Sequence, residues 1–502
     1  MHSANQIKLK KIELIFLIII AMIFLNINYH YNVSDDILSY DEGDYFQAAK
    51  KGFFVNWYDA DDISISEFVQ MGIEAFRGTK SVQQLSDEFR KDDITIFLRH
   101  NHSPVALYPF FIVESLKLGL PIEKQMRLTN LIWVYIWLII ILILFLKFPQ
   151  ISSPWFILIP ISSNLSISMS YFNMHIPFGL MSSLGFYCWY YYEKEPNEKW
   201  FRILAIFFIS TAIVCVEYSL FLLGALILWC AQYLLFSSER KKFLKSCFMN
   251  LVIGFSFIII LWPASIFKLN LLKSYSHQIY MSIFRISKLE TSPFNSFWNM
   301  IFWKWSPSIF ELIILIFIFS VVVFLIVKKN KSSSLFVSFI LLSIIMFLQL
   351  NPNLTLRWYL FPVFIIAYFV LVPIILSEVT ELKLQQKTNQ MLFLLCFSLV
   401  IFFNLASSRE KEYSETKEIK IKISEVNYSN IILPRSLFPQ LRNYINGNVI
   451  DYHDKLFENK FFLDSLGQNY KNYLLVLPIK CDRGDKGRLV LKTNSYSLVH
   501  IL

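Results

Sequence analysis

Charged side chains are scarce in this chain of 502 residues: Asp, Glu, Lys and Arg make up 17% of it, while 55% is hydrophobic. A soluble domain carries about 25% charged residues, so this chain lacks the polar residues needed to cover its own core. The shortage excludes a soluble enzyme and a disordered protein. Cysteine is rare as well, with six residues and no C-x-x-C or Cys/His spacing, which excludes a disulfide scaffold and does not indicate a zinc site. The composition predicts a polytopic membrane protein.

Long apolar runs take the place of the missing charge. The first run, 12–31, is about 20 residues long, which is enough to span a bilayer. It follows Lys8, Lys10 and Lys11, and no small-residue cleavage site comes after it, so we expect a retained first helix rather than a signal peptide. Ten further runs are candidate spans: 128–146, 154–171, 176–192, 201–216, 219–236, 248–262, 309–327, 335–350, 358–376 and 391–406.

The distribution of charge supports eleven spans with a cytoplasmic N-terminus. Residues 32–100 hold 14 acidic and seven basic residues, whereas Arg240–Lys245 and Lys328–Lys331 are basic. Cytoplasmic loops collect Lys and Arg, and alternation from a cytoplasmic start places both basic segments inside and the acidic segment outside. The net charge of +10 therefore reflects topology rather than nucleic-acid binding.

This topology predicts two domains. Residues 1–408 form an all-α membrane domain with an outer loop at 32–125 and a second outer loop at 263–308. The first outer loop carries short surface helices, expected at 44–54, 66–77 and 104–118. Residues 409–502 form a small α/β domain outside the cytoplasm. Its expected elements are strands at 419–423, 431–433, 449–452, 473–477 and 488–492 and helices at 436–444 and 455–466.

Few ionisable residues lie inside the predicted spans; Glu217 and His175 lie at their outer ends. Ion-coupled transporters and pumps usually place charge at mid-membrane depth, and many transporters consist of two related halves. Neither feature is present, although a lipid or polysaccharide transporter or flippase stays open as an alternative, as does a non-catalytic outer-face scaffold. Polar residues collect at the outer face, which favours a reaction there.

Four short motifs occur in order along the outer face. The first is Asp41-Glu42, about ten residues after the first span and followed by Ala48-x-x-x-Gly52. The others are His102-Ser103-Pro104-Val105, then Arg127 before an apolar run, and finally Arg357-Trp358-Tyr359-Leu360-Phe361-Pro362. Together they resemble the GT-C membrane glycosyltransferases, in particular the branch with protein O-mannosyltransferases and the aminoarabinose transferases of lipid A (glycosyltransferase family 39). The resemblance extends from the first helix to about residue 376.

The resemblance implies an inverting glycosyltransferase, an enzyme that moves a sugar from a polyprenyl-phosphate-linked donor to a glycan, lipid or protein acceptor on the outer face. Asp41 is then the general base, assisted by Glu42. The family's His-Pro-Pro motif has Ser103 in place of its first proline here. Many members carry a second acidic site after the third span, but residues 171–175 have no carboxylate. No metal ligands are therefore predicted, and a divalent cation stays possible.

Several residues are candidates for binding the donor or acceptor, because a phosphate leaving group needs cations rather than a general acid. Some have a plainer explanation: His102 could cap its helix, Arg127 and Arg357 could anchor span ends, and Glu217 could be a structural partner. The abundance of Ile, Lys, Asn and Phe is typical of an AT-rich bacterial genome, so we expect the bacterial cytoplasmic (inner) membrane. The candidate substrate-binding residues are His102, Arg127, Glu217, Lys268, Lys273, Arg285, Arg357 and Tyr359.

Overall fold

The structure is a computed structural model, in which the chain forms two compact units. One unit comprises residues 1–33, 101–116 and 127–408, and the other comprises residues 34–100, 117–126 and 409–502. Besides scattered residues within 15–26, 70–79, 219–230 and 365–370 and the single residue 38, the structure describes residues 40–49, 104–147, 172–195, 197–216, 240–263, 414–426, 430–434, 437–445, 447–452, 454–458, 460–470, 472–478 and 488–501.

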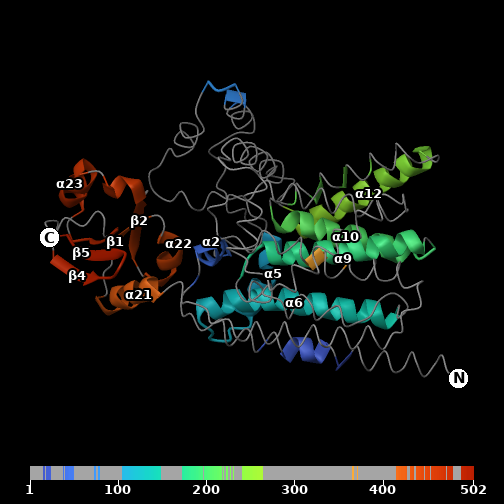
Figure 1. Cartoon of the computed structure of the whole chain (residues 1–502), viewed down its shortest axis with the longest axis horizontal. Helices are drawn as coiled ribbons and strands as arrows, with labels where there is room; N and C mark the ends of the chain where they lie inside the picture. The colour runs from blue at the N-terminus through green and yellow to red at the C-terminus, as the bar shows by residue number, and fades with distance from the viewer. Residues whose placement is uncertain are drawn as a thin grey trace, which may run out of the picture. The chain divides into compact units, whose positions relative to one another are not determined.

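Long helices dominate the described part of the first unit (Figure 1). They cover four of the predicted spans and the predicted surface helix at 104–118. Two of them are long and apolar enough to cross a bilayer, over Ile122–Leu144 and Leu244–Leu261. At 1.5 Å per residue these stretches are about 35 and 27 Å long, close to the ~30 Å hydrocarbon core. The helices are η3 (Pro104–Leu107), α5 (Tyr108–Ser115), α6 (Ile122–Lys147), α9 (His175–Lys194), α10 (Lys199–Cys215) and α12 (Arg240–Leu261).

Helices α9 and α10 form an antiparallel pair joined by a short turn, and they lie side by side in Figure 1. The rings of Tyr191 and Phe201 stack across the pair with centroids 4.5 Å apart. Further along, Gly185 lies so close to α10 that a Cβ atom there would be 2.6 Å from Cγ1 of Ile209. The absence of a side chain at position 185 therefore sets how closely the two backbones approach.

The short helix α5 is fixed to its neighbours by polar contacts. Nε1 of Trp133 on α6 donates a hydrogen bond to the carbonyl of Ala106 in η3, at 2.8 Å. The hydroxyl of Tyr108 donates to the carbonyl of Leu261, the last residue of α12. Phe110 and Val113 are buried while Ile112 is 57% exposed.

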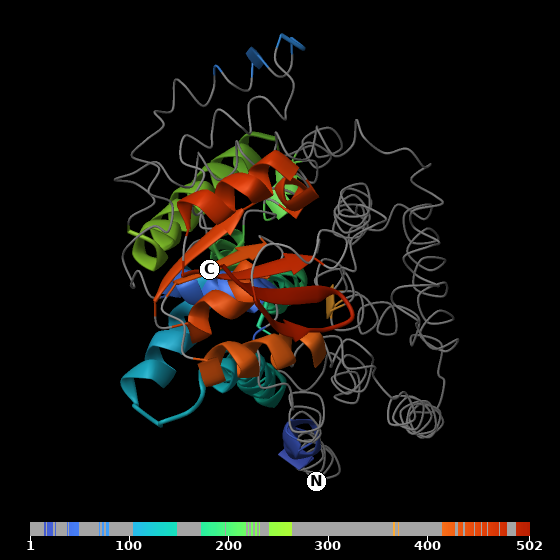
Figure 2. The same cartoon turned by 90° about the vertical axis from the view of Figure 1, so that its left-hand side faces the viewer.

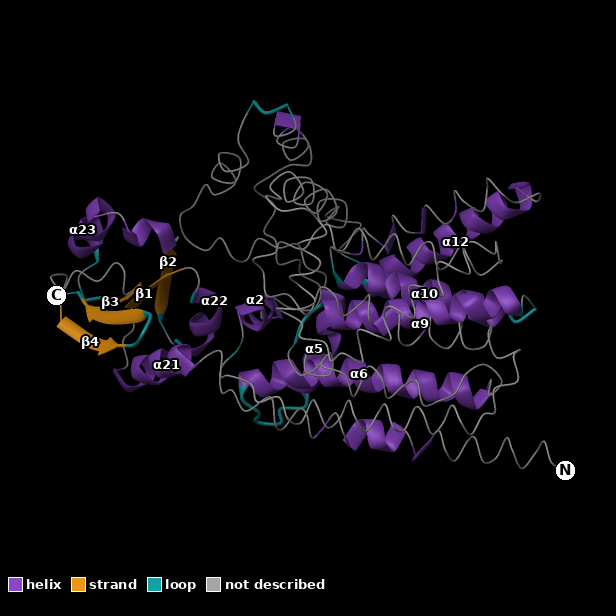
Figure 3. Ribbon diagram, viewed as in Figure 1, coloured by secondary structure: helices purple, strands orange, loops and turns teal. Residues whose placement is uncertain are grey.

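The second unit contains a five-stranded sheet in the order β2-β1-β3-β5-β4. The first three strands are parallel, and β5 is antiparallel to both β3 and β4. The sheet lies between two helical layers: α21 and α22 pack on one face and η9 and α23 on the other, which Figure 3 shows as strands between α23 and α21. The elements are α21 (Ser414–Val426), β1 (Asn430–Pro434), α22 (Phe438–Leu441), η8 (Arg442–Tyr444), β2 (Asn448–Tyr452), η9 (Asp454–Glu458), α23 (Lys460–Asn469), β3 (Leu474–Pro478), β4 (Arg488–Lys492) and β5 (Tyr496–His500).

The central strands are buried on both faces because helices cover both sides of the sheet. In β1, Ile431 and Leu433 pack toward α21 and α22, whereas Ile432 packs toward α23. The sequences of strands buried on both faces are continuous apolar runs. The edge strand β4 is largely exposed and begins and ends with a cation, Arg488 and Lys492, which discourages pairing with another chain. Figure 2 shows the sheet from another side.

One predicted strand, 419–423, is wrong: these residues lie inside helix α21. The alternation Ile419-Lys420-Ile421-Lys422-Ile423 has the period of a strand, but its Lys and Glu residues are good helix formers. In the helix, Ile419 and Ile423 are four residues apart and buried, while Ile421 is 49% exposed. The other four predicted strands are present, and β5 was not predicted.

Candidate functional site

The acidic pair Asp41-Glu42 lies in the first turn of helix α2 (Tyr40–Ala49), in the second unit. Acidic residues in a first turn interact favourably with the helix dipole, so the cluster itself promotes a helix there. Position 42 shares one buried face of α2 with Tyr45, Phe46 and Ala49, at helical spacing. The helix begins four residues before the predicted segment 44–54.

Glu42 has no exposed surface. Burying a carboxylate costs several kcal/mol unless polar groups compensate it, so its surroundings determine what it can do. Helix α2 packs against α22 and η8 of the C-terminal domain. The hydroxyl of Tyr444, the last residue of η8, lies close enough to Glu42 for the carboxylate to act on it electrostatically.

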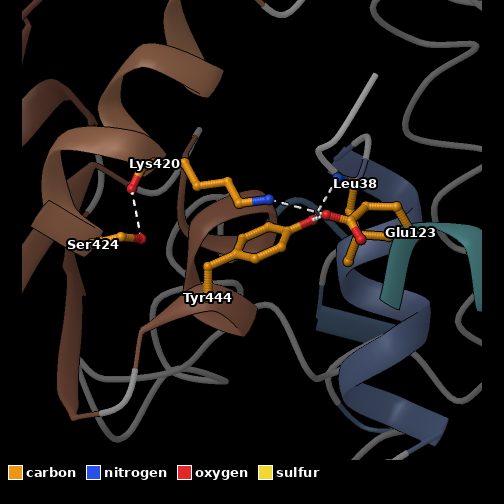
Figure 4. A network of polar contacts seen from close by, with 5 residues as sticks. All are labelled: Leu38, Glu123, Lys420, Ser424 and Tyr444. Atoms are coloured by element: carbon orange, nitrogen blue, oxygen red, sulfur yellow. Dashed lines mark hydrogen bonds and ion pairs between the residues drawn. The ribbon is translucent and has the colours of Figure 1, made fainter. Parts of the chain in front are cut away.

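Tyr444 lies at the centre of a chain of polar contacts in this unit (Figure 4). Its hydroxyl accepts a hydrogen bond from the backbone N–H of Leu38 and donates one to Oε1 of Glu123, each at 2.9 Å. Lys420 on α21 donates to the same Glu123 oxygen at 3.0 Å. The Lys420 ammonium also lies 3.7 Å from the centre of the Tyr444 ring, within the range of a cation–π interaction.

The surroundings of Tyr444 keep its hydroxyl protonated. Partial burial is the largest effect and raises the pKa of Tyr444 well above its ordinary value of 10.0. The carboxylate of Glu123 raises this pKa further, by its charge and by accepting the hydrogen bond, and Glu42 adds a smaller effect. The hydrogen bond from the N–H of Leu38 lowers this pKa, but by less than burial and Glu123 raise it. At neutral pH the phenol is therefore a hydrogen-bond donor to Glu123.

Two of the predicted site residues have described side chains. Glu42 is buried near Tyr444. Arg127 on α6 is also buried, with 1% of its surface exposed. Arg127 belongs to the first unit and lies more than one turn inside α6, so it does not extend to water as a span-end anchor would. Asp41 lies in α2, but its side chain is outside what the structure describes. The other predicted residues are also outside the described residues: His102, Glu217, Lys268, Lys273, Arg285, Arg357 and Tyr359.

The residues that accompany Glu42 were not predicted as site residues. Glu123, Lys420 and Tyr444 come from segments up to 321 positions apart, and none of them belongs to a local motif. Among the described residues, no group of three His, Cys, Asp or Glu side chains could hold a metal ion.

At the N-terminal end of α9, Oδ1 of Asn173 accepts a hydrogen bond from the backbone N–H of His175 and lies 2.6 Å from its Nδ1. Both residues are buried. They belong to segment 171–175, which has no carboxylate. Asn173 precedes the N-cap residue Met174, and its side-chain oxygen satisfies the N–H of His175, the first residue of the helix.

No family model, curated protein or solved structure matches this chain. Its function is therefore inferred from its own residues.

Proposed function

We propose that this protein is an integral membrane glycosyltransferase that moves a sugar from a polyprenyl-phosphate-linked donor to an acceptor on the outer face of the membrane. The observation that carries the proposal is the acidic first turn of α2, where Glu42 is wholly buried although its segment is rich in polar residues. A buried acid of this kind is costly and indicates a functional site more often than an exposed acidic cluster does.

The membrane location rests on composition and on the described helices. Helices α6 and α12 have the length and apolar character of spans. On α12 the apolar side chains Leu251, Phe255 and Ile260 are more than half exposed, which suits contact with lipid tails. Eleven spans with the N-terminus inside remain the topology that we propose.

The proposed reaction needs one proton acceptor and a site for a phosphate. The acceptor hydroxyl attacks the anomeric carbon, the bond from that carbon to the phosphate oxygen breaks, and Asp41 takes the hydroxyl proton. Polyprenyl phosphate leaves with both bonding electrons, and attack from the opposite side inverts the anomeric carbon. We assign the base role to Asp41, with Glu42 orienting the acceptor or a neighbouring cation.

Cations are needed where the phosphate carries its charge. The residues proposed to bind the phosphate are Arg127, Arg357 and the basic residues of loop 263–308 (Lys268, Lys273 and Arg285). His102, Tyr359 and Glu217 are proposed as further contacts to the sugar donor or to the acceptor. Guanidinium groups bind phosphate through two parallel hydrogen bonds.

The test is transfer by membrane vesicles from cells that express the full-length protein. The vesicles, which also contain native acceptors, are incubated with radiolabelled polyprenyl-phosphate-linked mannose, glucose, galactose, N-acetylglucosamine and aminoarabinose. We expect one donor to lose its sugar to a membrane acceptor with release of polyprenyl phosphate. Asp41→Asn should lower the rate by about 10²–10⁴-fold. Glu42→Gln should cost less.

Asp44→Asn is the matched control, since it removes the same charge from the same helix and should have the smallest effect. Equal losses in all three variants would indicate a general need for negative charge and no specific base. Unchanged transfer by Asp41→Asn would contradict the catalytic assignment. Movement of the intact sugar-lipid across the vesicle membrane, without cleavage of the sugar–phosphate bond, would support the flippase alternative instead.

A further inference from the structure

The contact chain of Leu38, Tyr444, Glu123 and Lys420 joins the C-terminal domain to the segment that leads into α2, within the second unit (Figure 4). The described bond to that segment goes to backbone and not to a side chain: the Leu38 N–H donates to the Tyr444 hydroxyl. Leu38 comes two residues before α2 and three before Asp41. A bond to backbone at this point constrains the direction in which the chain enters the helix.

Tyr444 is itself held from two directions. Its hydroxyl donates to Glu123, and the Lys420 ammonium covers its ring while binding the same Glu123 oxygen. Glu123 is 4% exposed and Lys420 is the cation that balances it. Charge-assisted bonds of this kind are about twice as strong as neutral ones, so the hydroxyl has one well-defined position.

Burial makes the bond to Leu38 costly to lose. Leu38 is completely buried, and a buried N–H left without its acceptor carries its full desolvation cost. The apolar face of α2 also packs on α22 and η8. The packing holds the helix against the domain, while the hydroxyl of Tyr444 determines where its first turn lies.

We propose that Tyr444 is a positioning residue: through its hydroxyl, braced by Glu123 and Lys420, the C-terminal domain holds the first turn of α2 and hence the Asp41 carboxylate in place for catalysis. The effect on catalysis rests on the proposed function. The mechanical statement, that the Tyr444 hydroxyl holds the first turn of α2 in place, does not. The C-terminal domain is thus part of the framework that holds the active site.

The mechanical statement is tested by hydrogen exchange of the full-length protein in detergent or nanodiscs. Tyr444→Phe keeps the ring under Lys420 and removes only the hydroxyl. We expect amide exchange in 34–49 to become at least about 10-fold faster, while exchange in α23 and the sheet stays unchanged. Glu123→Gln, which keeps a neutral oxygen for Tyr444, should cause a smaller change of the same kind.

Tyr470→Phe is the matched control. It removes a hydroxyl from the same domain, where it hydrogen-bonds Tyr452 at 2.9 Å, but on the opposite face of the sheet. Exchange in 34–49 should be unaffected by this variant. If Tyr444→Phe lowers the yield of folded protein too far to measure, Glu123→Gln against Tyr470→Phe makes the same comparison.

The catalytic statement is tested by kinetics with the sugar donor that wild-type vesicles use. A displaced base costs turnover rather than binding, so Tyr444→Phe should lower kcat about 10-fold with the donor KM within twofold. Loss of folded protein alone would lower the amount of active enzyme without local loosening of 34–49.

The outcomes separate the two proposals. If wild-type vesicles show no transfer but Tyr444→Phe loosens 34–49, the glycosyltransferase proposal fails and the mechanical role of Tyr444 stands. If wild type transfers sugar and Tyr444→Phe matches Tyr470→Phe in exchange and in kcat, the positioning role is overturned. Faster exchange over the whole domain in Tyr444→Phe would also overturn it, because Tyr444 would then serve stability in general.

Discussion

At the scale of single residues, the most consequential feature is a phenol between carboxylates. Tyr444 donates a hydrogen bond to Oε1 of Glu123, and the charge of Glu42 also raises its pKa. The cation Lys420 is bound to the same Glu123 oxygen. A phenol can donate to a carboxylate only while it is protonated. The contact chain that leads to Leu38 therefore depends on the protonation state of one side chain.

This dependence predicts how stability changes at high pH. The pKa of Tyr444 is raised above 10.0 in the folded protein, so above about pH 10 the unfolded chain loses this proton first. The folded state then holds more protons, and stability falls as pH rises. We expect the stability advantage of wild type over Tyr444→Phe to be full below about pH 10 and to shrink above it.

Thermal unfolding of both full-length proteins in detergent, measured between pH 8 and pH 11, checks this. All other tyrosines are common to the two proteins and cancel in the difference. A difference in Tm that stays constant over this range would contradict the raised pKa.

At the scale of elements, helix α21 shows why periodicity alone misled. The isoleucines at 419, 421 and 423 alternate like a strand, yet two of them lie on a buried helical face and the third is exposed. Two isoleucines four residues apart can both pack against the sheet when the segment is helical. The Lys422–Glu425 pair at 3.0 Å also stabilises the helix. Sequence alternation could not distinguish these cases.

The helix pair α9–α10 permits a prediction based on close approach. At Gly185 a Cβ would lie 2.6 Å from Cγ1 of Ile209 and 3.3 Å from its backbone nitrogen, so the Ile209 side chain or one of the helices must shift. We expect Gly185→Ala to destabilise the protein by about 1–3 kcal/mol. The midpoint of thermal unfolding in detergent measures the effect.

Gly254 on α12 is the matched control for this substitution. A Cβ there would be 3.4 Å from Oγ of Ser210 and 3.5 Å from Cγ2 of Ile206, which is ordinary contact, so Gly254→Ala should be neutral or stabilising. Ile209→Ala combined with Gly185→Ala should be more stable than the two single effects predict, because the clash is removed. Strict additivity would show that Gly185 is not packed against Ile209.

At the scale of the whole molecule, sequence order and structural grouping differ. The C-terminal domain groups with residues 34–100 and 117–126 rather than standing alone. In a chain with outer loops and an outer domain, such grouping is possible only if both lie on the same side of the membrane. The proposed topology meets this condition.

Sidedness can be measured directly. We expect a reporter fused after Lys331 to be cytoplasmic and one fused after Leu502 to be outside, because Lys328, Lys329 and Lys331 form a basic segment between spans. Alkaline phosphatase and fluorescent-protein fusions at both points give the readout. The same sidedness at both points would remove the eleven-span topology and the outer-face site with it.

Composition and local pattern were enough to predict several features of this protein. The scarcity of charge and the long apolar runs predict helices such as α6 and α12, because length and hydropathy are local properties. The apolar runs of β1 and β3 predict buried strands for the same reason. Asp41-Glu42 stands out in the sequence because an acidic pair beside a first apolar run is visible without any structure.

Only tertiary structure decided which groups surround Tyr444. Glu123, Tyr444 and the Leu38 backbone meet through contacts between residues hundreds of positions apart, and no local pattern encodes such a meeting. The same holds for the helical state of 419–423, which depends on the sheet face that α21 covers. Local periodicity reports what a segment can form, whereas burial against a distant partner selects the form it takes and fixes the neighbours of each charge.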